Sequence, residues 1–257
     1  MRSQTSWLFE RLHAFKTCCT ILACACLLTS GCNKSSGGGV HLFELGTIPG
    51  STGLWVAGSI DGYDYRAYIP SSYDGTEEVP LLVAMHGTGG APGNMIATWG
   101  GIADEANFIV LAPSYFDNST YFTLAGDQAI FEMIAEIGDF YQIDSNRIHT
   151  NGISTGGTWS FLFALSYADS IASASVFAGG YTGANSFVVA AAQRPVPFYI
   201  THGTADPVLS VENARSAVSA LQFYGHAVTY DEHAGGHGVP TGAASAAWAA
   251  VGDSVLP

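Results

Sequence analysis

Hydrophobic and polar positions follow two different patterns along the chain. Residues 54–57 and 63–69 are strand-like, and Asp61-Gly62 between them is typical of a tight turn, so together they predict a β-hairpin. Farther along, short apolar runs alternate with segments of helical periodicity. In the segment 127–141 the apolar positions fall on one helical face: Ile130, Met133, Ile134, Ile137 and Tyr141.

The alternation of apolar runs and helical segments continues to the end of the chain. It predicts strands over residues 81–85, 108–112, 147–153, 173–178, 197–201 and 227–231, and further helices over residues 156–167, 213–224 and 243–251. Short apolar strands that alternate with helices indicate an α/β protein. Its central sheet is expected to be mostly parallel, with helices on both faces.

The first residues have the pattern of an export signal rather than of the folded core. Positive residues precede the uncharged apolar run 17–28, which is too short to span a bilayer as a mature helix. Thr29-Ser30-Gly31-Cys32 follows and resembles a bacterial lipobox, in which the cysteine is lipidated. An ordinary secretory signal cut nearby is the alternative.

This pattern predicts three parts. Residues 1–31 form a lipoprotein signal peptide, residues 32–45 a lipidated N-terminus with a flexible tether, and residues 46–257 the catalytic domain. Cys32 would then bind the lipid bilayer. Asn33 is not the aspartate that resembles an inner-membrane retention signal, so we expect an exported lipoprotein at the outer membrane or cell surface.

Cysteine positions and charge limit which catalytic groups and which partners the protein can have. All five cysteines lie at or before Cys32, so the mature domain has no disulfide and no thiol nucleophile. The net charge is −13. The basic residues beyond the signal are scattered singly, at Lys34, Arg66, Arg147, Arg194 and Arg215. No basic patch can neutralise phosphates, which excludes nucleic acid as a partner.

The segment Gly152-Ile153-Ser154-Thr155-Gly156 joins a predicted strand to a predicted helix. It has the G-x-S-x-G pattern of a nucleophile elbow, in which a strained turn lifts a serine above the sheet. A glycine-rich turn with an inert serine is the structural alternative. A serine hydroxyl is a weak nucleophile, so a catalytic Ser154 requires a base, an acid and an oxyanion site.

The acid is expected after the serine, at the carboxyl end of a strand. Asp206 meets this requirement because it lies in the loop after the strand 197–201. Its structural alternative is a turn or helix-capping aspartate before Pro207. Asp231 and Glu232 lie within or at the end of the last strand and are weaker candidates.

Four histidines follow the serine and compete for the role of base. His202 precedes the acid and is expected to have a structural role, and His226 lies before the last strand, at the wrong edge of the sheet. His233 and His237 both come after that strand. The glycine pair before His237 lets the backbone swing it toward Ser154, so His237 is preferred and His233 is second.

The oxyanion site is expected to combine two backbone N–H groups. Thr155 supplies the one that follows the nucleophile, and Thr88 supplies the other, with Gly89 as the alternative. His86 is expected to brace this loop by hydrogen bonds. A phosphate cradle is disfavoured because no lysine follows the glycines. No cofactor is expected, and no histidine or cysteine pattern indicates a metal.

Four segments together resemble the polyhydroxybutyrate depolymerase and feruloyl esterase-like branch of the α/β-hydrolases. They are Tyr141-Gln142-Ile143-Asp144-Ser145-Asn146-Arg147, His86-Gly87-Thr88-Gly89-Gly90, His202-Gly203-Thr204-Ala205-Asp206 and Gly235-Gly236-His237. The resemblance spans about residues 50–240 and implies an α/β-hydrolase fold. Lid domains of such enzymes are common between residues corresponding to 178 and 197, and the shortness of that link predicts no large lid.

The resemblance implies a secreted carboxylic ester hydrolase with Ser154, Asp206 and His237 as its triad. The ester substrate would be a small molecule or a polymer. An acyltransferase or peptidase with the same triad, and a non-catalytic surface-binding lipoprotein, are the alternatives. Aromatic residues that could shape the pocket are Trp99, Tyr115, Phe116, Trp159 and Tyr181. No feature of the sequence indicates an oligomeric state.

Overall fold

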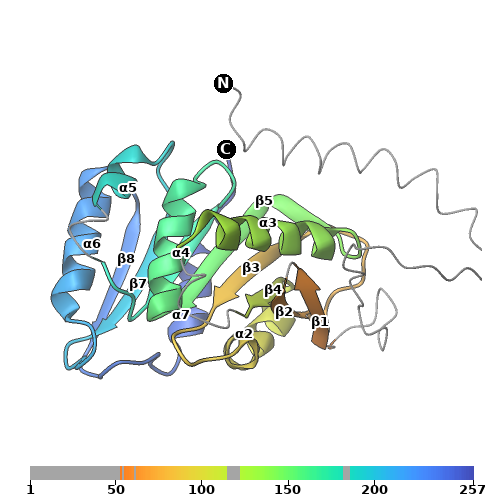
Figure 1. The fold of residues 1–257 in the computed structure, drawn as a ribbon, viewed down its shortest axis with the longest axis horizontal. Coiled ribbons are helices and arrows are strands. Elements are labelled where there is room, and N and C mark those ends of the chain that lie inside the picture. Colours follow the sequence, from red (N-terminus) through yellow and green to blue (C-terminus); the bar gives the residue numbers. More distant parts are fainter. Residues whose placement is uncertain (1–52, 54, 61, 115–121, 182–185) are drawn as a thin grey trace, which may run out of the picture. The chain divides into compact units, whose positions relative to one another are not determined.

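The computed structural model describes residues 53, 55–60, 62–114, 122–181 and 186–257. The predicted signal peptide, Cys32 and the tether lie outside these residues, as do Tyr115 and Phe116. The described residues form a central sheet and helices that cover it (Figure 1).

The sheet has eight strands in the order β1-β2-β4-β3-β5-β6-β7-β8. β1 (Trp55–Ile60) and β2 (Tyr63–Tyr68) form the predicted antiparallel hairpin, and β2 is also antiparallel to β4. All other neighbours are parallel. These strands are β3 (Val79–Met85), β4 (Ile109–Pro113), β5 (Ile143–Ile153), β6 (Ser173–Phe177), β7 (Phe198–Gly203) and β8 (Val228–His233).

Helices cover both faces of the sheet. α2 (Pro92–Ala106) and α7 (Ala243–Val251) pack on one face, where Trp99, Phe108 and Phe177 form the centre of a buried cluster. The other face is covered by α3 (Leu124–Gly138), α4 (Thr155–Ser166), α5 (Ser186–Ala191) and α6 (Val211–Phe223) (Figure 1). No helix in the described part of the chain is long and apolar enough to cross a membrane.

Two helices were not predicted from the periodicity. α2 begins with Pro92 at its first position and contains Gly100-Gly101, which are both poor helix formers, so its pattern is weak despite the buried Met95 and Trp99. α5 has only six residues and lies in the link between β6 and β7. Within the described residues of that link, α5 is the only helix, as the predicted absence of a large lid requires.

Candidate active site

Ser154 occupies the sharp turn between the end of β5 and the start of α4. Its backbone dihedrals are φ 55° and ψ −120°, a region that a non-glycine residue rarely adopts. The turn is held from both sides, because Ser154 N–H donates to the Phe177 carbonyl (2.9 Å) and its own carbonyl accepts from Thr158 N–H (3.0 Å). Such local strain is characteristic of a nucleophile elbow.

The two glycines of the elbow are required by close backbone contacts. A Cβ on Gly152 would overlap the carbonyl of Gly156, and a Cβ on Gly156 would overlap the carbonyls of Met85 and His86. The start of α4 therefore lies directly against the end of β3. This approach brings Ser154 beside the loop that follows β3, where a Cβ on Gly87 would lie 3.1 Å from Ser154 Cβ.

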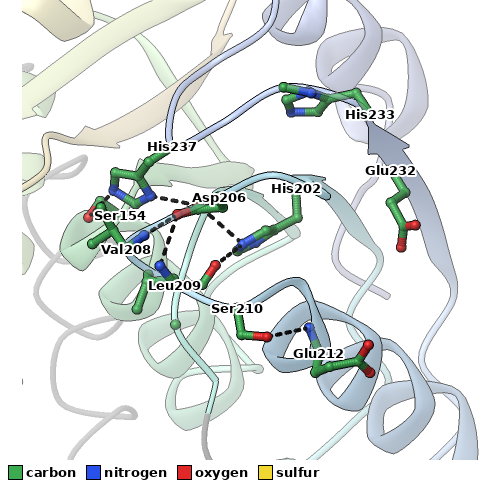
Figure 2. A network of polar contacts seen from close by, with 12 residues as sticks. Ser154, His202, Asp206, Val208, Leu209, Ser210, Glu212, Glu232, His233 and His237 are labelled. Carbon is green, nitrogen blue, oxygen red and sulfur yellow. Dashed lines mark hydrogen bonds and ion pairs between the residues drawn. The ribbon is translucent and has the colours of Figure 1, made fainter.

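The structure brings Ser154, His237 and Asp206 together from three separate loops (Figure 2). His237 Nε2 lies 2.9 Å from Ser154 Oγ, and His237 Nδ1 lies 2.7 Å from Asp206 Oδ2. A carboxylate only accepts hydrogen bonds, so the proton is assigned to Nδ1 and the lone pair to Nε2. In this tautomer His237 can accept the serine proton, which a base must do.

Asp206 is a buried carboxylate whose oxygens are surrounded by donors. Its side chain has no exposed surface, and its Oδ1 accepts from the N–H groups of Val208 (2.8 Å) and Leu209 (2.9 Å). Burial opposes ionisation of Asp206. The hydrogen bonds from Leu209, His237 and Val208 outweigh that burial, so the pKa of Asp206 lies below its ordinary value. The carboxylate therefore carries its charge beside His237.

Backbone hydrogen bonds join the loop of Asp206 to the loop of His237. Thr204 N–H donates to the His233 carbonyl (2.7 Å), and Ala205 N–H donates to the Gly235 carbonyl (3.0 Å). His233 also contributes its ring, since Nδ1 accepts from Gly235 N–H (3.0 Å). Its side chain lies at the end of β8, away from Ser154 (Figure 2). His233 therefore braces the loop, while His237 is the histidine that contacts the serine.

The predicted oxyanion residues, Thr88 and Thr155, face each other across the elbow. Thr155 is the first residue of α4, where a backbone N–H has no acceptor within the helix. Its Oγ1 lies 2.7 Å from Thr88 Oγ1. The loop of Thr88 is braced by His86, whose Nδ1 donates to the Gly87 carbonyl (2.8 Å), as the sequence predicted. Burial lowers the pKa of His86, so the ring is neutral near pH 7.

The remaining candidate acids and bases have other partners. His226 is buried, and its Nδ1 accepts from Val196 N–H (2.9 Å). Asp231 accepts from Tyr199 OH (3.2 Å), and Glu232 forms an ion pair with Arg215 (2.6 Å). His202 makes the structural hydrogen bond expected of it, from Nε2 to the Leu209 carbonyl (2.9 Å), and its ring also lies against Asp206, four residues farther along the chain. In the described ranges no metal-binding group of three His, Cys, Asp or Glu side chains occurs.

The aromatic pocket candidates that the structure describes are core residues. Trp99 and Trp159 are buried, and their Nε1 atoms donate to Asn151 and Asp127 respectively. Tyr181 is also buried. Its ring packs edge-on against Phe161. These residues support the sheet and α4 from inside.

Comparison with known proteins shows similarity to esterases. A bifunctional acetylxylan esterase/xylanase of Neocallimastix patriciarum is 31% identical over 156 residues, 59% of this chain and 22% of that enzyme. A probable feruloyl esterase C of Aspergillus terreus is 27% identical over 202 residues, 75% of this chain and 70% of the relative. The chain thus spans about a fifth of the first relative and about two thirds of the second. No protein-family model matches the chain.

Solved structures with the same architecture confirm the α/β-hydrolase fold. A thermostable esterase matches with a TM-score of 0.58 at 25% identity, over 77% of this chain and 58% of that one. An S-formylglutathione hydrolase from Agrobacterium tumefaciens matches with a TM-score of 0.60 at 18% identity, over 75% and 90% of the two chains. The sheet order and the helices on both faces are therefore those of this fold.

Proposed function

We propose that this chain is a serine hydrolase that cleaves carboxylic esters through an acyl-enzyme. The observation that carries the proposal is the continuous hydrogen-bonded path from Ser154 Oγ through His237 to Asp206. Two further observations support the proposal: Ser154 lies on a strained elbow, and the similar proteins are named as esterases. The triad geometry is what acyl transfer by a serine requires.

The first half of the reaction forms the acyl-enzyme. Ser154 Oγ attacks the ester carbonyl carbon while His237 Nε2 takes its proton, and the carbonyl electrons move onto oxygen. The N–H groups of Thr155 and Thr88 hold that oxyanion. When the tetrahedral intermediate collapses, the bond to the alcohol oxygen breaks, and His237 returns the proton to the leaving alcohol.

The second half releases the acid. Water attacks the acyl carbonyl, His237 takes a proton from it, and a second oxyanion forms at the same N–H groups. Collapse breaks the bond to Ser154 Oγ, which regains its proton from His237. Throughout, Asp206 keeps the proton on His237 Nδ1 and stabilises the imidazolium, because its own carboxyl stays ionised.

Ser154→Ala tests the assignment directly. We expect the variant to fold normally and to lose hydrolysis of p-nitrophenyl esters by about 10⁴- to 10⁶-fold in kcat. A fluorophosphonate probe should label the wild type and not the variant. Residual activity within tenfold of the wild type, or an unlabelled wild type, would reject the triad and favour a binding protein.

The proposed substrates are feruloyl, other aryl or short-chain esters, or a polyhydroxyalkanoate. The resemblance of the four sequence segments and the names of the relatives support this range. A panel of p-nitrophenyl esters of increasing chain length, a feruloyl ester and a polyhydroxyalkanoate film would rank the candidates. Matched amides and added alcohol acceptors would reveal a peptidase or an acyltransferase, which use the same triad.

We further propose that the enzyme is exported and anchored to a membrane through lipid on Cys32. The support is the sequence pattern of residues 17–32. Cells fed a labelled fatty acid should transfer the label to the wild type and not to Cys32→Ser. Fractionation should find the wild type in the outer membrane. Its recovery in the inner membrane, or unlabelled wild type, would contradict this proposal.

A further inference from the structure

His202 is a second histidine at the carboxylate of Asp206. It lies on β7, one residue before the end of that strand, and its side chain has no exposed surface. Its Nε2 lies 2.9 Å from the Leu209 carbonyl oxygen and 3.3 Å from Asp206 Oδ2 (Figure 2). The triad reaction described above does not use this ring.

The contacts of His202 Nε2 determine which ring nitrogen carries a proton. A carbonyl oxygen and a carboxylate oxygen can only accept hydrogen bonds, so Nε2 must be the donor. The N–H donates to Leu209 O, and Oδ2 of Asp206 lies at its flank. The same Oδ2 accepts from His237 Nδ1 at 2.7 Å. Asp206 Oδ2 thus lies between the N–H groups of two histidines.

The position of His202 also closes the loop that carries Asp206. His202 lies on β7 just before this loop and Leu209 lies near the loop's end, so the bond from Nε2 to Leu209 O spans it. Leu209 N–H in turn donates to Asp206 Oδ1. Leu209 therefore links the two side chains: its carbonyl oxygen accepts from His202, and its backbone N–H donates to Asp206.

We propose that His202 is a positioning residue that orients the Asp206 carboxylate toward His237. The inference rests on the proposed function. With Oδ1 held by Val208 and Leu209, and Oδ2 faced by His202, the carboxylate has one orientation in which Oδ2 meets His237 Nδ1. Without the Nε2–H group the loop loses the bond between its two ends, and the carboxylate is held less firmly in that orientation. A small misplacement of catalytic groups costs up to about 10²-fold in rate.

Two amide substitutions test whether the effect comes from a donor at the position of Nε2 or from the imidazole ring as a whole. The amide nitrogen of Gln can occupy the position of Nε2, whereas the shorter Asn reaches only the position of Nδ1. We expect His202→Asn to lower kcat by about 10- to 100-fold with KM within twofold, because the buried ring does not touch substrate. His202→Gln should keep kcat within about threefold of the wild type.

A double-mutant cycle tests whether the effect passes through Asp206. In the Asp206→Ala background, His202→Asn should cause no further loss of kcat, because the group that it orients is gone. An equal loss in both backgrounds would show a general structural role and overturn the proposal. Wild-type kcat in a folded His202→Asn would overturn it as well.

Controls keep this result separate from the proposed function and from unfolding. Fluorophosphonate labelling of the wild type tests the triad itself, so an active wild type together with a folded His202→Asn of unchanged kcat rejects only this inference. Circular dichroism establishes that each variant is folded. If His202→Asn does not fold, His202→Gln decides. Retention of kcat and of the low-field proton resonance of His237 Nδ1–H supports the proposal, and a loss of kcat above tenfold overturns it.

Discussion

Thr88 Oγ1 lies 2.7 Å from Thr155 Oγ1, so one hydroxyl–hydroxyl hydrogen bond joins the loop after β3 to the first residue of α4. The two residues are the proposed donors of the oxyanion site, and they are 67 positions apart in sequence. The bond therefore ties the loop after β3 to the start of α4, the helix that follows β5. It constrains the spacing of the two backbone N–H groups through the side chains of the same two residues.

Thr88→Val should weaken the oxyanion site without removing a backbone donor. Valine keeps the shape of threonine and loses the hydroxyl, so the link of about 1 kcal/mol disappears, and kcat should fall about fivefold. Thr88→Ser retains a hydroxyl and should remain within about twofold of the wild type. Steady-state kinetics with a p-nitrophenyl ester measure both. Equal kcat values for the two variants would contradict a role for the bond.

Gly156→Ala should destabilise the elbow. A Cβ at this position overlaps the carbonyls of Met85 and His86, which are backbone atoms and cannot turn aside. We expect a loss of at least about 2 kcal/mol in the free energy of unfolding, measured by urea denaturation. Gly101→Ala is the matched control, because Gly101 lies exposed in α2 with open space around its Cα. It should raise stability by about 0.5–1 kcal/mol.

His149 should make the protein less stable in mild acid. Burial, with a smaller contribution from Arg147, lowers the pKa of His149 to about 3. The unfolded state protonates near pH 6.5 and the folded state does not, so stability is lost as pH falls from about 6.5 toward 3. The expected loss is roughly 1.4 kcal/mol per pH unit in that window.

The variant His149→Asn has no titratable side chain at this position, so its stability is compared with that of the wild type. Its free energy of unfolding should vary less with pH between 6 and 4 than that of the wild type. The slope should not vanish, since burial also lowers the pKa values of His86 and His226. Parallel slopes for the two proteins would show that His149 is protonated when folded. Urea denaturation at several pH values supplies the comparison.

The position of the site was predictable because the site lies where parallel strands end. Ser154, Asp206 and His237 each follow a predicted strand, and the carboxyl ends of parallel strands meet at one edge of the sheet. The strands β3, β4, β6 and β7 are wholly buried, which is why their apolar pattern was clear. In the structure these three residues are joined by two hydrogen bonds.

Contacts made by loop side chains were not predictable in the same way. His202 on β7 and Asp206 in the following loop are four residues apart, but a loop has no periodicity that predicts which strand side chain its residues meet. The Thr88–Thr155 bond depends on how closely α4 approaches β3, and that distance is set by packing at Gly156. The helix α2 was missed because Pro92 and Gly100-Gly101 obscure its apolar face.

Asp206→Asn should inactivate the enzyme through the tautomer of His237. The amide can donate to His237 Nδ1, which moves the ring proton to Nε2, and Nε2 can then no longer accept the proton of Ser154. We expect kcat to fall by about 10⁴-fold and the rate of fluorophosphonate labelling to fall in parallel.

Asp231→Asn is the matched control for Asp206→Asn, since Asp231 was one of the two weaker candidate acids and contacts Tyr199 instead of His237. Its kcat should stay within about twofold of the wild type, because the Asp231 side chain does not contact the triad. Asp206→Asn should also be less stable than the wild type above pH 4. The pKa of Asp206 is lower in the folded state than in the unfolded state, so the ionised carboxylate stabilises the folded wild type at these pH values. The wild type loses this contribution only in stronger acid. If Asp231→Asn lost activity and Asp206→Asn kept it, the acid of the site would be Asp231.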